Sequence, residues 1–192
     1  MPGTIIGCLG AQRSGKTLFA YKLVKAIHEA YDIPVYTNIY SPQDDFHYIN
    51  SLEDFPLDLS PKILFIDEIY NGLDAQDYKK LKEISIFINT IGKQNCLFVY
   101  TTIEAEMVYN RLRNQTQTVV VVSKNDSNIY YKLINLADMS SSIHSVPIND
   151  KLFENVYYDT QFIPLDFDWG MKDWRNKLSN FYRDNYGLIV NL

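Results

Sequence analysis

The stretch Gly10-Ala11-Gln12-Arg13-Ser14-Gly15-Lys16-Thr17 is the most informative part of this chain. It satisfies the pattern G-x-x-x-x-G-K-[ST] at every position, and an apolar run over residues 4–9 leads into it. The glycines permit a tight loop whose backbone N–H groups, at the start of a helix, attract phosphate oxygens. Lys16 is then expected to reach the terminal phosphates of a nucleotide, and the Thr17 hydroxyl to hold Mg²⁺. The whole stretch is therefore the candidate nucleotide site.

A second signal is the run Ile63-Leu64-Phe65-Ile66-Asp67-Glu68, in which an expected strand ends in two acids. Asp67 is expected to bind Mg²⁺ through water, and Glu68 to polarise the attacking water as general base. A small-molecule kinase needs no such base, because the acceptor is its substrate's hydroxyl group. The acid pair therefore favours an ATPase, with ATP and Mg²⁺ as the expected cofactors.

Apolar runs alternate with helical patterns through the first two thirds of the chain. The expected strands are 4–10, 34–39, 62–69, 96–101 and 118–122, and the expected helices are 17–31, 78–91 and 104–113. A polar loop is expected over residues 40–58. This alternation predicts an α/β domain built on a mainly parallel five-stranded core sheet with right-handed crossovers.

The pattern changes after Ser123. Residues 124–128 have turn chemistry between two apolar runs and predict a hairpin. The stretch 171–182 predicts a terminal helix that carries Trp174, Leu178 and Phe181 on one face. We therefore expect an ATPase core over residues 1–123 and a C-terminal extension over 124–192 (hairpin, loops and terminal helix) packed on the core.

Composition excludes several classes of protein. The chain has 192 residues, of which 46% are hydrophobic, and 18 Lys and Arg against 23 Asp and Glu give a net charge of −5. This apolar content excludes a disordered chain, and the acidic balance excludes a generally basic nucleic-acid coat, though not a local basic groove. No apolar run reaches the roughly 18 residues that span a bilayer, so no membrane span is expected. Cys8 and Cys96 lie in apolar runs and are expected to be buried thiols.

Taken in order, GAQRSGKT, VYTNI, ILFIDE, LFVYTT and RLR resemble the motifs of viral genome-packaging ATPases, which stand near the FtsK/HerA-type motors and the ATPase part of phage terminases. The resemblance covers roughly residues 4–123 and implies a P-loop NTPase of the ASCE, RecA-like type. In that type an extra strand, here 96–101, lies between the phosphate-loop strand and the acidic strand. The resemblance further implies a homo-oligomeric ring that moves double-stranded DNA into a capsid, with a capsid vertex protein as a further partner. Such a protein would act in the cytoplasm of an infected cell or on the virion.

The resemblance also implies roles for residues outside the two main motifs. Thr101 or Thr102, at the tip of the fourth strand, would sense the γ-phosphate, and Arg13 would contact that phosphate in cis. Arg111 and Arg113 are candidates for an arginine finger that acts on a neighbouring subunit. The alternative for this pair is an ordinary set of helix C-terminal cations that complement the helix dipole.

Two positions depart from the motifs of the relatives. The relatives often have Gln after the paired threonines, where this chain has Ile103-Glu104. They also often carry an arginine in the helix after the acidic strand, where only Lys93 is available here. The lysines around that helix, Lys79, Lys80, Lys82 and Lys93, are the candidate DNA contacts, or else a solvated helix face.

Three other functions remain open from the residues alone. An assembly or secretion protein like the Zot group of filamentous phages shares the phosphate loop and a similar acidic strand, but usually continues into a membrane segment. A nucleotide kinase would carry an arginine-rich lid, and residues 111–113 hold the only close arginine pair. A regulatory ATPase that is not a motor is the third alternative.

Overall fold

The computed structural model describes residues 3–71, 78–159 and 166–189. The strands are β1 (Ile5–Leu9), β2 (Val35–Thr37), β3 (His47–Tyr48), β4 (Lys62–Ile66), β5 (Cys96–Thr102), β6 (Thr118–Lys124), β7 (Asn128–Asn135) and β8 (Ser141–Pro147). The helices are α1 (Lys16–Tyr31), α2 (Tyr78–Thr90), α3 (Asn110–Gln115), α4 (Asp150–Phe153) and α5 (Trp174–Tyr186). Short 3-10 turns are η1 (Leu52–Asp54), η2 (Ile91–Gln94) and η3 (Ala105–Met107).

All these strands form one eight-stranded sheet in the order β3-β2-β4-β5-β1-β6-β7-β8. The strands from β3 to β6 in this order are parallel, whereas β7 and β8 run antiparallel as a hairpin extension. The predicted α/β class is confirmed, and so is the position of β5 between the acidic strand β4 and the phosphate-loop strand β1. The carboxyl ends of the parallel strands therefore meet along one edge of the sheet.

Two hydrophobic clusters hold the helices against the sheet, one on each face. One contains buried side chains of α1 and Leu152 of α4, and the other contains those of α2, α3 and α5. Every residue of β4 and β5 is buried, because helices cover both faces of these central strands. Cys8 and Cys96 are both buried and free, as predicted.

The structure differs from the sequence prediction at several places, and it adds β8 and α4 where loops were expected. The expected polar loop contains β3, a two-residue strand whose His47 ring stacks on Tyr36 of β2 at 4.8 Å between centroids. Strand β4 ends at Ile66, so Asp67 and Glu68 belong to the following turn. The expected helix over 104–113 is divided into η3 and α3, because the buried Val108 between them is extended.

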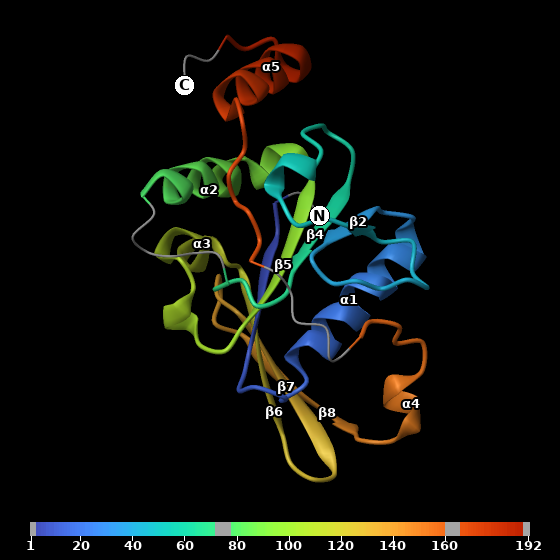
Figure 1. Cartoon of the computed structure of the whole chain (residues 1–192). Helices are drawn as coiled ribbons and strands as arrows, with labels where there is room; N and C mark the ends of the chain where they lie inside the picture. The colour runs from blue at the N-terminus through green and yellow to red at the C-terminus, as the bar shows by residue number, and fades with distance from the viewer. Residues whose placement is uncertain (1–2, 72–77, 160–165, 190–192) are drawn as a thin grey trace.

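Helix α5 packs at the amino edge of the sheet, at the end of the molecule opposite α4 (Figure 1). Leu178 and Phe181 are buried, as the predicted apolar face requires, and the side chain of Trp174 lies outside the described part. The Tyr186 hydroxyl donates to the Lys93 carbonyl oxygen at 2.9 Å, which ties α5 to η2. Within the described residues, no helix combines the length and apolarity that a membrane crossing requires.

Candidate nucleotide site

The predicted phosphate loop connects β1 to α1 at the carboxyl edge of the sheet. Gly15 has a φ of 99°, a left-handed conformation that favours glycine. Gly10 passes so close to β6 that a Cβ there would lie 2.4 Å from the Val122 carbonyl oxygen. The loop geometry therefore requires both glycines. The first N–H groups of α1 lack partners within the helix, so they are available to bind a phosphate held in this loop.

The side chains of this loop divide into an exposed and a buried set. Ala11, Gln12 and Arg13 are exposed, whereas Ser14 and Lys16 are each only 4% exposed. The Ser14 hydroxyl is buried and has no hydrogen-bond partner within the described part of the chain. A buried hydroxyl needs a partner, and a phosphate oxygen held in the loop would supply one. These residues therefore fit the phosphate end of a nucleotide.

Asp67 joins the loop to the acidic strand. Its Oδ1 accepts a hydrogen bond from the Thr17 hydroxyl at 2.9 Å and another from the Thr101 hydroxyl at 2.6 Å. Burial raises the pKa of the Asp67 carboxyl, as does the negative charge of Glu68, while the bonds from Thr101 and Thr17 act in the opposite direction. A cation bound at this carboxylate would offset the cost of burying its charge. The pair Thr17 and Asp67 thus supplies the hard oxygen ligands that Mg²⁺ prefers.

Asn38 is a site residue that the sequence analysis missed. Its side chain makes both bonds that the Asp67 backbone offers, because Nδ2 donates to the Asp67 carbonyl oxygen at 3.0 Å and Oδ1 accepts from the Asp67 N–H at 2.8 Å. Asn38 directly follows β2, which pairs with β4. The sequence indicated this residue only through its position, since Asn38 is a polar residue at the end of the expected strand, within the run VYTNI.

Glu68 lies in a turn whose backbone is fixed by Thr101. Its N–H donates to the Thr101 hydroxyl at 2.9 Å, and the next N–H, that of Ile69, donates to the Thr101 carbonyl oxygen at 3.0 Å. Glu68 itself has a φ of 51° and a half-buried side chain. The predicted sensor Thr101 is fully buried and bonded to both acidic residues. In this structure Thr101 therefore fixes the position of the Asp67 carboxylate and of the Glu68 backbone.

The three predicted arginines are not gathered at one point. Arg13 lies on the loop with a φ of 59° and an exposed side chain. Arg113 is bound within its own helix region, since its guanidinium donates to the Ala105 carbonyl oxygen at 3.3 Å and to Asn110 Oδ1 at 2.7 Å. Arg111 is exposed on α3. Lys93 lies in η2, which leads into the amino end of β5, the edge of the sheet opposite the phosphate loop.

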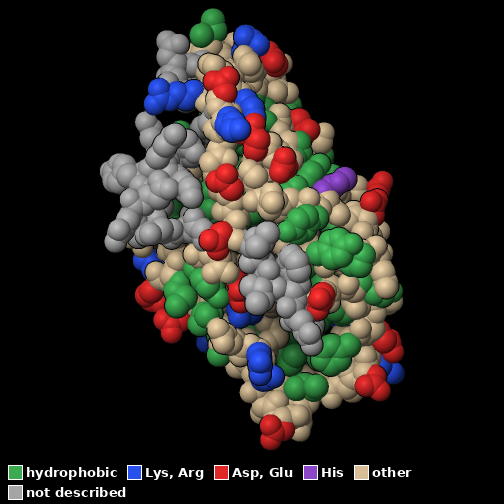
Figure 2. All heavy atoms as spheres, viewed as in Figure 1, with side chains coloured by type: hydrophobic (Ala, Val, Ile, Leu, Met, Phe, Trp, Pro, Cys, Tyr) green, Lys and Arg blue, Asp and Glu red, His purple; other side chains and the backbone are tan. Residues whose placement is uncertain are grey.

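The candidate DNA contacts are only partly described. The side chains of Lys79, Lys80 and Lys82 lie outside the described residues. The Lys93 ammonium group lies over the Tyr182 ring, 4.8 Å from its centroid. On the face that Figure 2 shows, the described basic side chains are scattered among acidic ones and form no continuous band.

The C-terminal segment also reaches the surroundings of the site, which the sequence did not indicate. The Tyr158 ring packs against Tyr21 of α1 with 4.9 Å between centroids. Burial raises the pKa of the Tyr158 hydroxyl, and so does the charge of Asp67. The C-terminal segment therefore places an aromatic ring against α1, the helix that begins at the phosphate loop.

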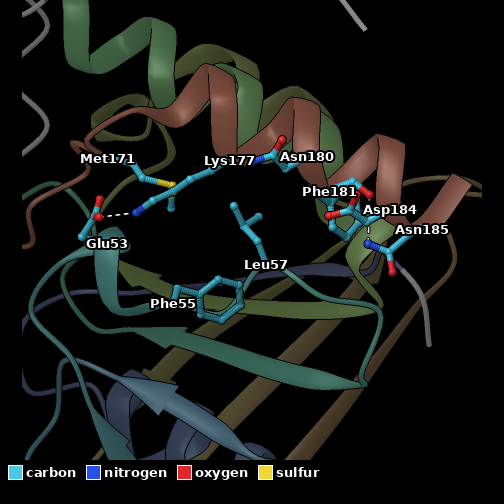
Figure 3. A pocket seen from close by; sticks show the side chains of 9 residues that line it. All are labelled: Glu53, Phe55, Leu57, Met171, Lys177, Asn180, Phe181, Asp184 and Asn185. Carbon is cyan, nitrogen blue, oxygen red and sulfur yellow. Dashed lines mark hydrogen bonds and ion pairs between the residues drawn. The ribbon is translucent and has the colours of Figure 1, made fainter. Parts of the chain in front are cut away.

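A separate pocket of about 390 Å³ lies between the η1 region and α5 (Figure 3). Glu53, Phe55 and Leu57 line one side of it, and Lys177 and Phe181 of α5 line the other. It contains none of the predicted site residues, and η1 and α5 both lie away from the phosphate loop (Figure 1). The nucleotide site is therefore defined by the loop and the acid pair, not by this pocket.

Solved structures of other proteins have a similar fold. The N-terminal domain of zonular occludens toxin from Neisseria meningitidis matches with a TM-score of 0.60 and 18% identity, over 83% of this chain and 100% of that chain. B204, the DNA-packaging ATPase from Sulfolobus Turreted Icosahedral Virus, matches with a TM-score of 0.54 and 13% identity, over 77% and 99% of the two chains. The genome packaging NTPase B204 from Sulfolobus turreted icosahedral virus 2, in complex with ATP-gammaS, matches with a TM-score of 0.54 and 10% identity, over 77% and 99%.

The chain has a P-loop NTPase fold. No protein-family model matches the sequence, and no curated protein matches it at a significant level. At these identities the likeness establishes the P-loop NTPase fold alone, because one fold carries many activities.

Proposed function

We propose that the chain is an oligomeric, Mg²⁺-dependent ATPase that translocates double-stranded DNA and fills a viral capsid. One observation carries the ATPase part. The Asp67 carboxylate accepts the Thr17 hydroxyl of the phosphate loop at 2.9 Å, and Glu68 follows Asp67 directly. A base beside the metal ligand is what water attack on ATP requires. The motor part is supported by the order of the sequence motifs and by the likeness to a DNA-packaging ATPase.

Each part of the site has a role in this ATPase. Residues 10–17 hold the phosphates through backbone N–H groups, and the Lys16 ammonium group neutralises the terminal ones. Thr17 and Asp67 would hold Mg²⁺, which when bound offsets phosphate charge. Glu68 accepts a proton from the attacking water. The same proposal places other copies of the chain, double-stranded DNA and a capsid vertex protein among its partners.

ATP turnover by the purified chain tests the chemistry. We expect Mg²⁺-dependent hydrolysis that Lys16→Ala abolishes by weakening nucleotide binding. Glu68→Gln should still bind ATP but hydrolyse it about 100-fold or more slowly, because the base is lost while the metal ligand Asp67 stays. Unchanged turnover in Glu68→Gln would remove Glu68 from this role.

DNA is tested in the same assay. Phosphate contacts carry no sequence information, so turnover should rise with double-stranded DNA of any sequence at low salt and lose that rise as salt increases. Replacing Lys79, Lys80 and Lys82 with Glu should abolish the rise if these lysines follow the DNA. A rise that survives the replacement would place the DNA on another surface.

A second candidate is a Zot-like assembly or secretion ATPase. It is favoured by the match that covers the whole N-terminal domain of zonular occludens toxin, with a TM-score of 0.60. Both candidates use the same hydrolytic site, so Lys16→Ala and Glu68→Gln do not separate them. ATP hydrolysis that double-stranded DNA never stimulates would favour the assembly role over packaging.

A further inference from the structure

The carboxylate of Glu68 is held by the two polar side chains that follow it in the chain. Asn71 Nδ2 donates to Glu68 Oε2 at 3.3 Å. The Tyr70 hydroxyl lies beside the same carboxylate, whose negative charge raises the pKa of that hydroxyl. Neither residue belongs to the two motifs of the sequence analysis, and we name the two together the Tyr70–Asn71 clasp.

The backbone of this turn brings the clasp to Glu68. Asn71 N–H donates to the Glu68 carbonyl oxygen at 2.9 Å, which closes the turn over residues 68–71. Between them Ile69 is fully buried, and its N–H is bonded to the Thr101 carbonyl oxygen. The turn is thus fixed to β5 at one point and to the core at another. These contacts hold Glu68 at its φ of 51°.

A carboxylate that acts as a base must hold one orientation toward the attacking water. A half-buried glutamate has several rotamers, and hydrogen bonds from fixed neighbours select among them. Burial raises the pKa of Tyr70 to about 12, helped by the negative charge of Glu68. The Tyr70 hydroxyl therefore keeps its proton at neutral pH and stays a donor. Asn71 Nδ2 is a donor at any pH.

We propose that Tyr70 and Asn71 are positioning residues for ATP hydrolysis, which orient the Glu68 carboxylate toward the attacking water. This inference rests on the proposed function, because it assigns Glu68 the role of base. The clasp touches neither the phosphate loop nor the metal ligand Asp67 in any described hydrogen bond. Its loss should therefore slow the chemical step and leave nucleotide binding intact.

Steady-state kinetics of Tyr70→Phe and Asn71→Ala test the clasp. Each change removes one donor and no bulky group, and we expect kcat to fall about tenfold, the scale on which a supporting hydrogen bond acts. KM for ATP, and the affinity for a non-hydrolysable ATP analogue measured by calorimetry, should stay as in the wild type. The matched controls are Tyr186→Phe and Asn185→Ala on α5, which remove the same groups at the opposite edge of the sheet. Both controls should keep wild-type kcat.

Double variants test whether the Tyr70–Asn71 clasp acts through Glu68. In a Glu68→Gln background, adding Tyr70→Phe or Asn71→Ala should slow turnover no further, because the group that they orient has lost its function. Wild-type kcat in both clasp variants, or equal losses of analogue binding and kcat, would overturn the inference. If Glu68→Gln hydrolyses ATP at the wild-type rate, the proposed function fails and the clasp fails with it. A slow Glu68→Gln with unaffected clasp variants rejects the clasp alone.

Discussion

At the scale of single residues, the Thr101 hydroxyl connects the two acids of the site. It donates to Asp67 Oδ1 at 2.6 Å and accepts the Glu68 N–H at 2.9 Å. Thr101 and Asp67 are both buried, so water cannot replace either bond. Removing the hydroxyl would leave a buried carboxylate with one donor fewer and a buried N–H without its acceptor.

We therefore expect Thr101→Val to lower the free energy of unfolding by about 1–3 kcal/mol and also to slow ATP hydrolysis. Urea unfolding and ATP turnover measure the two effects. Thr90→Val is the matched control, because the Thr90 hydroxyl is also buried, donates to the Phe87 carbonyl oxygen and accepts from Gln94. It should lower stability by a similar amount and spare turnover. Equal turnover in the two variants would show that Thr101 has no special role at the site.

At the scale of elements, Asp44 and Lys25 bind helix α1 to two segments that lie far from it in the sequence. Its Oδ1 accepts from Lys25 of α1 at 2.6 Å, and its Oδ2 accepts from the hydroxyls of Tyr21 and Ser41. Lys25 also donates to the Asn155 carbonyl oxygen at 3.0 Å and lies 4.2 Å from the centroid of the Tyr157 ring. The helix that begins at the phosphate loop is thereby bound to the loop after β2 and to the C-terminal segment.

Asp44→Asn should lower the free energy of unfolding by about 3 kcal/mol, because it removes the buried counter-ion of Lys25 and leaves, among the described residues, only the exposed Glu29 carboxylate, 3.9 Å away. Burial alone would raise the pKa of Asp44, but bonds from Lys25, Ser41 and Tyr21 hold it below its usual 3.8. The stabilisation is complete above the unfolded-state pKa and is lost as the pH falls through the lower folded-state one. Urea unfolding at pH 7 and below pH 3 measures both effects, and the difference between the variant and the wild type should shrink at the lower pH.

Asp45→Asn is the control for this change, since Asp45 is the exposed neighbour in the same loop. We expect it to change stability by less than about 0.5 kcal/mol. If Asp44→Asn were equally mild, the ionic contact between Asp44 and Lys25 would contribute nothing to the stability of the fold.

At the scale of the whole molecule, the phosphate loop lies at the carboxyl ends of the parallel strands, and α5 lies at their amino ends (Figure 1). The helices α1 and α3 pack in different hydrophobic clusters, on opposite faces. Arg111 on α3 is exposed, whereas Arg113 is bonded within its own chain. Arg111 is therefore the better placed of the two to act on a neighbouring copy.

If Arg111 acts in trans, Arg111→Ala should lower turnover by roughly 10³, the gain that a transition-state arginine supplies. Mixing Arg111→Ala with Lys16→Ala subunits should restore part of the activity, because intact sites form where the two variants meet. Turnover per subunit should also rise with protein concentration, followed alongside native mass.

Arg13→Ala provides the contrast in the mixing experiment. Arg13 and Lys16 belong to the same loop, so a mixture of Arg13→Ala and Lys16→Ala contains no site with both residues if Arg13 acts in cis. A specific activity that does not change with concentration, together with no recovery in the Arg111 mixture, would return the role to Arg13.

The sequence by itself determined the features that depend on neighbouring residues. The phosphate loop is eight consecutive residues, and its glycines, its lysine and the helix that follows are sufficient to predict its shape. The α/β class also followed, because apolar runs that alternate with helical patterns leave few topologies open. The place of β5 beside β1 was implied by the resemblance that the order of the motifs carries.

Only the tertiary structure decided which distant residues meet. Asn38, Asp67 and Thr101 follow or end the adjacent strands β2, β4 and β5, so the strand order brings their side chains together. The edge strand β3 and the packing of Tyr158 against Tyr21 likewise depend on partners far along the chain. The physical reason is that a polar side chain at a strand end satisfies its hydrogen bonds with whichever strand lies next to it, and the packing of the whole sheet sets that neighbour.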